Sequence, residues 1–420
     1  MNKTANQLPV VTVIGGGMIT AIQLLPTLYH LQRIGRLGQI HICALQGRPL
    51  LAIQKDPALG KGFPGQSFVP HPDPAQGDLD QRHADLYKQV VDAMPARNIV
   101  VVALPDAMHF DATMYALAHD QHVLSVKPLV LSHQQAQQIE HLAAQRGLLV
   151  GVEYHKRFDT RSLMARQEYR SGRLGQFRAG QAHLVEKYYY RHSNFQNWCT
   201  CENSDMFTYI GCHYVDLVAF ITGLRPTGVS IYGLRQKYPN GREGYLWTDA
   251  RVLWENGAFL SILNGLGYPD AGPGGNTQGM TLFCEGEKDG TFLRHSDQYR
   301  GVVHSYTAAG TDPGDTVYAE PNPDYFRLVD QGEGGLTPCG YGHRSVEAII
   351  EAIAEVQRQG GDNLALRGQA IAKISQAGII ATPANSSYNE LVIEAGRLSL
   401  ASEGKLARIE YEPLPRVVLA

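Results

Sequence analysis

Short apolar runs alternate with helical segments along the first 155 residues of the chain. The runs have the length and composition of strands that are buried on both faces, and they cover 10–14, 39–45, 98–104, 122–126 and 148–154. A helix is predicted over 80–93, and the Ser132-x-x-Gln135 pattern opens another. This alternation predicts a doubly wound sheet of parallel strands.

From residue 176 onward the pattern changes to strands without helices between most of them. They are predicted over 176–187, 228–237, 246–254, 259–264 and 280–284. These strands predict a large, mainly antiparallel sheet with helices on one side and an open face on the other. Helices return over 345–358 and 385–400. We expect an α/β domain over 1–155 and an α+β domain over 156–420, with the helices from about 345 packing back on the first domain.

Composition excludes several classes of protein. Of the 420 residues, 44% are hydrophobic, which is too many for a disordered chain. The 37 basic and 40 acidic residues give a net charge of −3, which argues against a general nucleic-acid binder. We find no apolar run long enough to span a membrane and no secretory signal. The six cysteines are scattered and suggest no disulfide framework, so we expect a cytoplasmic protein.

A glycine cluster follows the first predicted strand directly. The pattern Gly15-x-Gly17-x-x-Thr20 lies between this strand and a helical stretch. Such a turn lets backbone N–H groups approach a pyrophosphate, and this predicts a Rossmann dinucleotide site. The contacting residues would be Gly15, Gly17, Met18 and Ile19. A purely structural turn is the alternative.

The acid that usually binds the adenosine ribose of the dinucleotide is missing after the second strand. No Asp or Glu precedes Asp56. Arg48 in the following segment would accept a 2′-phosphate, which favours NADP, whereas Gln46 would hydrogen-bond a ribose hydroxyl, which allows NAD. The choice between NAD and NADP stays open.

Polar residues follow three of the predicted strands, where ligands of parallel sheets bind. Leu104 and Pro105 end one strand, with His109 one turn later, and these three residues are assigned, together with Lys127, to cofactor binding. Lys127 follows the next strand. The run 148–154 is followed by three basic residues, His155, Lys156 and Arg157.

In this order, the motifs resemble the Gfo/Idh/MocA oxidoreductase family. The resemblance rests on the glycine turn, Pro105-x-x-x-His109, Val126-Lys127-Pro128, the run from His155 to Asp159, and Gly211-x-His213-x-x-Asp216. It implies oxidation or reduction of sugars or cyclitols with NAD(P). It also implies subunit contacts through the open sheet face, hence a homodimer or homotetramer. Val126 and Tyr209 depart from the family pattern, which has acids at these positions.

Four residues are candidates for the chemistry. Histidine titrates near neutral pH, so His213 is assigned as the general base or acid. Lys127 would hydrogen-bond the reacting oxygen and stabilise negative charge. Asp216, one helical turn after His213, would orient the imidazole or make only a local contact, and Tyr209 would pass a proton or serve in packing. The alternative for His213 is a buried structural histidine.

The segment 188–198 is rich in aromatic and amide side chains, which suit a sugar. Substrate binding is assigned to His155, Lys156, Arg157, Tyr188, Asn197, Trp198 and His213. The glycine-rich segment 264–279 is predicted to be a mobile loop beside the cleft. Cys199-x-Cys201 has no matching second pair, so no metal site is predicted.

Two other functions compete with the dehydrogenase. One is a glycoside hydrolase that keeps NAD bound and works by transient oxidation and elimination. The other is a regulator that binds a dinucleotide without catalysis. The presence of both Lys127 and His213 weighs against the regulator.

Overall fold

This computed structural model consists of two compact units, each defined by the contacts within it. The structure describes residues 8–272, 274–296, 304–307, 316–319, 324–332 and 334–420. The first unit comprises Met1–Val130, Gln134–His155 and Phe326–Ser386. The second comprises Leu131–His133, Lys156–Tyr325 and Ser387–Ala420. Each unit therefore combines segments that lie far apart in the sequence.

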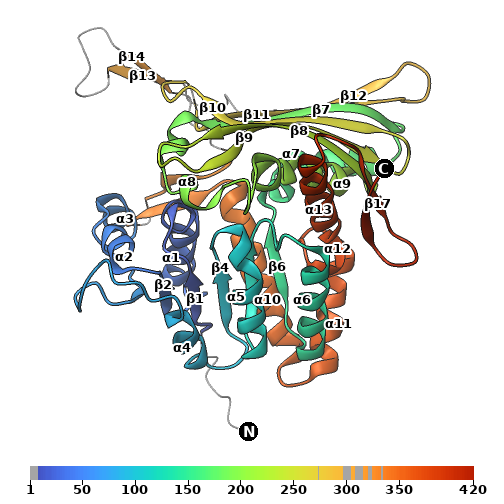
Figure 1. The fold of residues 1–420 in the computed structure, drawn as a ribbon. Helices are drawn as coiled ribbons and strands as arrows, with labels where there is room; N and C mark the ends of the chain where they lie inside the picture. The colour runs from blue at the N-terminus through green and yellow to red at the C-terminus, as the bar shows by residue number, and fades with distance from the viewer. Residues whose placement is uncertain (1–7, 273, 297–303, 308–315, 320–323, 333) are drawn as a thin grey trace. The chain divides into compact units, whose positions relative to one another are not determined.

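The first unit contains a sheet of six parallel strands in the order β3-β2-β1-β4-β5-β6 (Figure 1). The strands are β1 (Val11–Ile14), β2 (Ile40–Cys43), β3 (Val69–His71), β4 (Ile99–Val102), β5 (His122–Val126) and β6 (Val150–Glu153). Every residue of β1, β4 and β6 is buried, as the continuous apolar runs require. The predicted doubly wound parallel sheet is confirmed.

The register of this sheet aligns the carboxyl ends of its strands. Ile14 of β1 lies opposite Cys43 of β2 and Val102 of β4. On the other side, Val126 of β5 lies opposite Glu153 of β6. The loops that follow these strands therefore share one edge of the sheet, which is where ligands of such sheets bind.

Helices cover both faces of the first sheet. In Figure 1, α5 and α10 lie on opposite faces, and Gly151 of β6 lets α10 approach, because a Cβ there would lie 2.6 Å from Ile349. The helices of this unit are α1 (Leu25–Arg33), α2 (Gly47–Gln54), α3 (Pro57–Gly62), α4 (Leu86–Asp92), α5 (His109–Ala118), α6 (His133–Arg146), α10 (Tyr341–Gly360), α11 (Leu364–Ala377) and α12 (Pro383–Ser386). A small pair, β15 (Arg327–Asp330) and β16 (Leu336–Cys339), completes the unit.

The second unit contains an eight-stranded sheet in the order β12-β11-β7-β10-β9-β8-β17-β18. All neighbours pair antiparallel except β7 and β10, which are parallel. This confirms the predicted large, mainly antiparallel sheet. The strands are β7 (Phe177–Lys187), β8 (Pro226–Lys237), β9 (Glu243–Trp254), β10 (Phe259–Tyr268), β11 (Asn276–Cys284), β12 (Thr291–Ser296), β17 (Ala407–Glu410) and β18 (Arg416–Leu419).

Helices of the second unit gather on one face of this sheet (Figure 1). They are α7 (Thr160–Arg170), α8 (Phe195–Trp198), α9 (Cys212–Thr222) and α13 (Tyr388–Ala401). The last helix, α13, packs on β8, β17 and β18 within this unit. The strands β13 (His304–Thr307) and β14 (Thr316–Ala319) form a separate pair.

Two sequence predictions are wrong in extent. The helix predicted over 80–93 begins only at Leu86, because residues 78–83 bond to the loop after β2. The segment 264–279 is mostly strand, since β10 continues to Tyr268 and β11 begins at Asn276. Its glycines have a packing reason: a Cβ at Gly265 or Gly267 would overlap the Trp247 ring. Among the described helices, none is long and apolar enough to cross a membrane.

Candidate active site

The turn after β1 has a backbone that only glycine readily adopts. Gly15 has a φ of +126°, and a Cβ there would lie 2.0 Å from the carbonyl oxygen of Ala103. The Gly15 carbonyl accepts a 2.7 Å hydrogen bond from the Thr20 hydroxyl. Thr20 thus closes the turn at the position where the motif usually has its third glycine.

The outer side of the same turn is open. A Cβ at Gly17 would meet no atom within 4 Å, and Met18 is 41% exposed. Ile19 follows and precedes a π-helical turn, Thr20–Leu24, which leads into α1. The turn therefore presents backbone, with little side-chain cover, at the start of a helix, as a pyrophosphate site requires.

Gln46 is the N-cap of α2, in the turn after β2, and Arg48 lies in the first turn of α2. The Arg48 guanidinium forms a bidentate ion pair with Asp80, and both side chains are largely exposed. The Gln46 amide donates to the Asp80 carbonyl at 2.8 Å. Sequence reasoning missed Asp80, because a helix was predicted to begin there.

His109 is a structural link between two strand ends. It is fully buried, and its ring nitrogens lie 2.7 Å from the carbonyl oxygens of Leu104 and Pro128. The imidazole thereby ties the end of β4 to the segment that follows Lys127. Burial and these two contacts fix the position of the imidazole between the two strand ends, and the cofactor contact expected for His109 stays a prediction.

Lys127 and His155 follow neighbouring strands, β5 and β6, and Lys127 is partly exposed. Beside them lies a buried acid that sequence reasoning missed. Glu153, at the end of β6, is 3% exposed. It accepts hydrogen bonds from the Gln23 amide at 2.9 Å and the Ser345 hydroxyl at 2.6 Å, and it lies 3.3 Å from the His155 Nδ1. Glu153 therefore orients His155.

In the second unit, Arg157 and Asp216 form a buried ion pair, with both side chains 2% exposed. The Asp216 carboxylate accepts from Arg157 Nε at 2.7 Å and from its Nη2 at 2.5 Å. It also accepts from the Tyr388 hydroxyl and the Asn389 amide, each at 3.0 Å. These partners differ from the His213 contact considered for Asp216. They hold the Arg157 guanidinium in place, and the substrate contact expected for Arg157 stays a prediction.

His213 and Tyr209 lie one turn apart. His213 is on α9 and is 5% exposed. Tyr209 lies in the π-helical turn Phe207–Gly211 that precedes α9. The Tyr209 ring packs edge-on against Phe195 at 4.8 Å and Trp198 at 5.5 Å. The structure thus joins Tyr209 to Trp198, from the segment predicted to bind substrate.

Lys156 belongs to a group of polar side chains in the second unit. It is 2% exposed, its ammonium donates to the Gln278 side chain at 2.6 Å, and it lies 5.2 Å from the centre of the Tyr214 ring. Asn276, two residues before Gln278 on the same face of β11, donates to Glu186 of β7 at 3.2 Å. Sequence reasoning missed these residues, because their positions on one sheet face depend on the strand register.

The remaining predicted substrate residues lie nearer the surface. Tyr188 is 46% exposed, and the Arg191 guanidinium lies 4.5 Å from its ring centre. Asn197 is exposed, and its side chain hydrogen-bonds Asn194 and Asn240. Nearby, burial and Glu186 raise the pKa of the Tyr190 hydroxyl, which therefore stays neutral.

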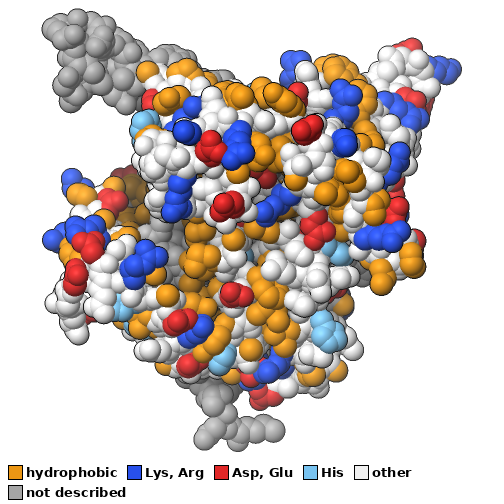
Figure 2. Space-filling view, in the orientation of Figure 1, with side chains coloured by type: hydrophobic (Ala, Val, Ile, Leu, Met, Phe, Trp, Pro, Cys, Tyr) orange, Lys and Arg blue, Asp and Glu red, His pale blue; other side chains and the backbone are white. Residues whose placement is uncertain are grey.

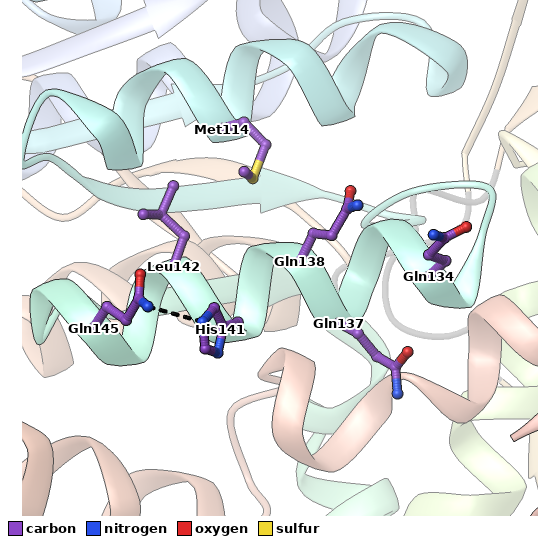
Figure 3. A pocket seen from close by; sticks show the side chains of 7 residues that line it. All are labelled: Met114, Gln134, Gln137, Gln138, His141, Leu142 and Gln145. Atoms are coloured by element: carbon purple, nitrogen blue, oxygen red, sulfur yellow. Dashed lines mark hydrogen bonds between the residues drawn. The ribbon is translucent and has the colours of Figure 1, made fainter. Parts of the chain in front are cut away.

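The depression shown in Figure 3 lies elsewhere, between α5 and α6. Its lining is rich in glutamine and contains none of the predicted site residues. The lining residues are Met114, Gln134, Gln137, Gln138, His141, Leu142 and Gln145. Within the described residues, no group of three or more His, Cys, Asp or Glu side chains is arranged to hold a metal ion.

Comparison with known proteins agrees with the fold. Residues 70–154 match the Gfo/Idh/MocA family model, described as an oxidoreductase family with an NAD-binding Rossmann fold. This stretch of the chain is therefore similar to the Gfo/Idh/MocA family. Among solved structures, scyllo-inositol dehydrogenase from Lactobacillus casei with NAD(H) and scyllo-inositol has a TM-score of 0.62 at 14% identity, covering 96% of this chain and 99% of that one. An inositol dehydrogenase homolog from Azotobacter vinelandii with NADH and myo-inositol has 0.62 at 17% identity, covering 96% and 98%.

Curated relatives match this chain over shorter stretches. An uncharacterized oxidoreductase of Schizosaccharomyces pombe is 29% identical over 24% of this chain and 27% of its own length. The NADP⁺-dependent scyllo-inositol 2-dehydrogenase IolW of Bacillus subtilis is 22% identical over 55% of this chain and 60% of its own length. D-glucoside 3-dehydrogenase of Escherichia coli is 24% identical over 30% and 36%. The matches thus span between about a quarter and three fifths of these relatives.

Proposed function

We propose that this chain is an NAD(P)-dependent dehydrogenase or reductase. It would transfer a hydride between a secondary alcohol and the nicotinamide. The observation that carries the proposal is the turn at Gly15, whose backbone geometry and open outer side suit a dinucleotide in a family of NAD-binding oxidoreductases. Backbone N–H groups from Gly17 to Ile19 would hold the pyrophosphate.

The proton chemistry is assigned to Lys127 and His213. The bound nicotinamide supplies the hydride acceptor. Lys127 would hydrogen-bond the reacting oxygen and stabilise its negative charge. His213 would take the hydroxyl proton on its imidazole during oxidation and return it during reduction. The ring contacts of Tyr209 with Phe195 and Trp198 favour a packing role for Tyr209 over a place in the relay.

The substrate class is a sugar, sugar acid, glycoside or cyclitol. Lys156, Gln278, Asn276 and Glu186 offer donors and acceptors of the kind that hydroxyl groups need. Relatives and solved neighbours named for inositols and glucosides support the same class. Substrate contact by Tyr188, Asn197 and Trp198 remains part of this proposal.

An activity screen tests the proposal. The purified chain is incubated with NAD⁺ or NADP⁺ and a panel containing scyllo-inositol, myo-inositol and simple glucosides, and reduced nicotinamide is followed by its absorbance. We expect turnover that falls by at least about 10²-fold in Lys127→Ala and in His213→Ala. Lys373→Ala and His141→Ala are matched controls, because both side chains are exposed and neither residue belongs to a motif.

The outcomes separate the three functions. Release of sugar from a glycoside without net reduction of added nucleotide would indicate the NAD-retaining hydrolase. Dinucleotide binding without turnover of any substrate, together with no effect of either substitution, would indicate the regulator. Turnover that is unaffected by both substitutions would contradict the assigned roles.

We also infer that the open face of the second sheet joins subunits into a homodimer or homotetramer. Phe259, Phe283 and Phe292 are 38%, 52% and 63% exposed and follow one row across neighbouring strands. Tyr232, on β8, is 71% exposed. Hydrophobic side chains are visible over this sheet in Figure 2. Exposed aromatic rows of this kind mark association surfaces.

A reducing compartment such as the cytoplasm fits the cysteines. All six are within the described residues, and no disulfide joins any of them. Four are buried, and burial raises the pKa of Cys43 to about 12. Such a thiol stays protonated and unreactive at neutral pH.

A further inference from the structure

The loop between β3 and α4 is bonded to the turn that follows β2. The backbone N–H of His83 donates to the Leu45 carbonyl at 2.8 Å, and that of Arg48 donates to the Leu79 carbonyl at 3.2 Å. The Gln46 amide donates to the Asp80 carbonyl at 2.8 Å. Residues 78–83 thus lie beside this turn, and we call this segment the acidic wall.

The acidic wall places the Asp80 carboxylate beside the end of β2, where the local sequence has no acid. Asp80 accepts from Arg48 Nε at 2.8 Å and forms a second contact with its terminal nitrogen. The Asp80 N–H is held in turn by the Asp78 carboxylate at 2.9 Å. Hydrogen bonds from Arg48 lower the pKa of Asp80, so the pair is fully ionised at neutral pH.

This position matters because of its place in the sheet. The N–H of Gly15 donates to the Cys43 carbonyl at 2.8 Å, so the pyrophosphate turn and the end of β2 are adjacent. In a doubly wound sheet, the residue after the second strand contacts the adenosine ribose of the dinucleotide. A carboxylate there accepts hydrogen bonds from ribose hydroxyls, whereas a cation whose charge is available accepts a 2′-phosphate.

We propose that Asp80 is the specificity-determining residue of the dinucleotide site and makes it prefer NAD over NADP. Asp80 supplies the carboxylate that the end of β2 lacks. It also forms an ion pair with the Arg48 guanidinium, whose charge is then not available to a phosphate. A 2′-phosphate would have to displace Asp80 from Arg48 and remain beside a negative charge. The inference rests on the proposed dinucleotide binding.

The test measures dissociation constants of NAD⁺ and NADP⁺ for the full chain by isothermal titration calorimetry at fixed salt. We expect the wild type to bind NAD⁺ at least about tenfold more tightly than NADP⁺. In Asp80→Asn the Arg48 charge becomes available, and the NADP⁺/NAD⁺ affinity ratio should rise by roughly tenfold or more, as expected for one charge-assisted hydrogen bond to phosphate.

Two further variants control this result. Asp73→Asn removes the same charge from the same loop, where Asp73 bonds Ala75 and Gln76, and should leave the ratio unchanged. Adding Arg48→Ala to Asp80→Asn should abolish the gain for NADP⁺. Absence of binding of either nucleotide to the wild type contradicts the proposed function itself. A wild type that prefers NADP⁺, or an unchanged ratio in Asp80→Asn, overturns the role of Asp80 alone.

Discussion

The buried ion pair between Arg157 and Asp216 gives the sharpest prediction about stability in the second unit. Both side chains are 2% exposed, so neither charge is solvated by water. Replacing Asp216 by Ala leaves the Arg157 guanidinium buried without its counter-charge. We expect a loss of about 3–5 kcal/mol in the free energy of unfolding.

A double substitution separates the ion pair from the rest of the network. Arg157→Met with Asp216→Leu removes both charges, and this alone is often neutral or stabilising. Here, however, Tyr388 and Asn389 also lose their acceptor. Each buried donor left without a partner costs about 1–3 kcal/mol, so the double variant should recover only part of the loss.

The assay is urea denaturation followed by fluorescence and circular dichroism. Tryptophans 198, 247 and 254 all lie in the second unit, so fluorescence reports its unfolding. Asp289→Ala is the matched control, because Asp289 is an exposed acid of the same unit. If Asp216→Ala were as stable as Asp289→Ala, or if the double variant recovered none of the stability lost in Asp216→Ala, the buried pair would not be coupled as described.

Three further predictions concern other parts of the chain. Gly15→Ala should abolish binding of NAD⁺ and NADP⁺ in calorimetry, because its Cβ would lie 2.0 Å from the Ala103 carbonyl; retained affinity would contradict the turn's role. Phe283→Asp should lower the molar mass in light scattering, whereas exposed Leu414→Asp, outside the aromatic row, should not. Burial lowers the pKa of His122 from 6.5 to about 3. As the pH drops from 6.5 toward 3, the unfolded chain therefore binds a proton at His122 before the folded chain does. The free energy of unfolding should fall over this pH range, by up to about 5 kcal/mol. Urea midpoints from pH 7 to pH 4 measure this, and a His122→Gln variant with the same acid dependence would refute it.

The sequence determined the class of fold, because burial leaves its mark locally. A strand covered on both faces must be apolar along its whole length, and β1, β4 and β6 could be predicted from this alone. A glycine turn directly after the first strand gave the position of the dinucleotide motif. Lys127 and His213 could be selected from motifs, although their roles remain predictions.

Tertiary structure alone decided which side chains meet. Asp80 reaches Arg48 through a loop that looked helical in sequence, and Tyr388 reaches Asp216 across 172 positions. His109 and Arg157 are motif residues, and only the structure shows which distant groups hold their side chains in place. The cofactor and substrate contacts expected for them stay predictions. The physical reason is the range of the forces: apolar periodicity follows from local burial, whereas ion pairs and buried hydrogen bonds depend on where distant segments are brought together.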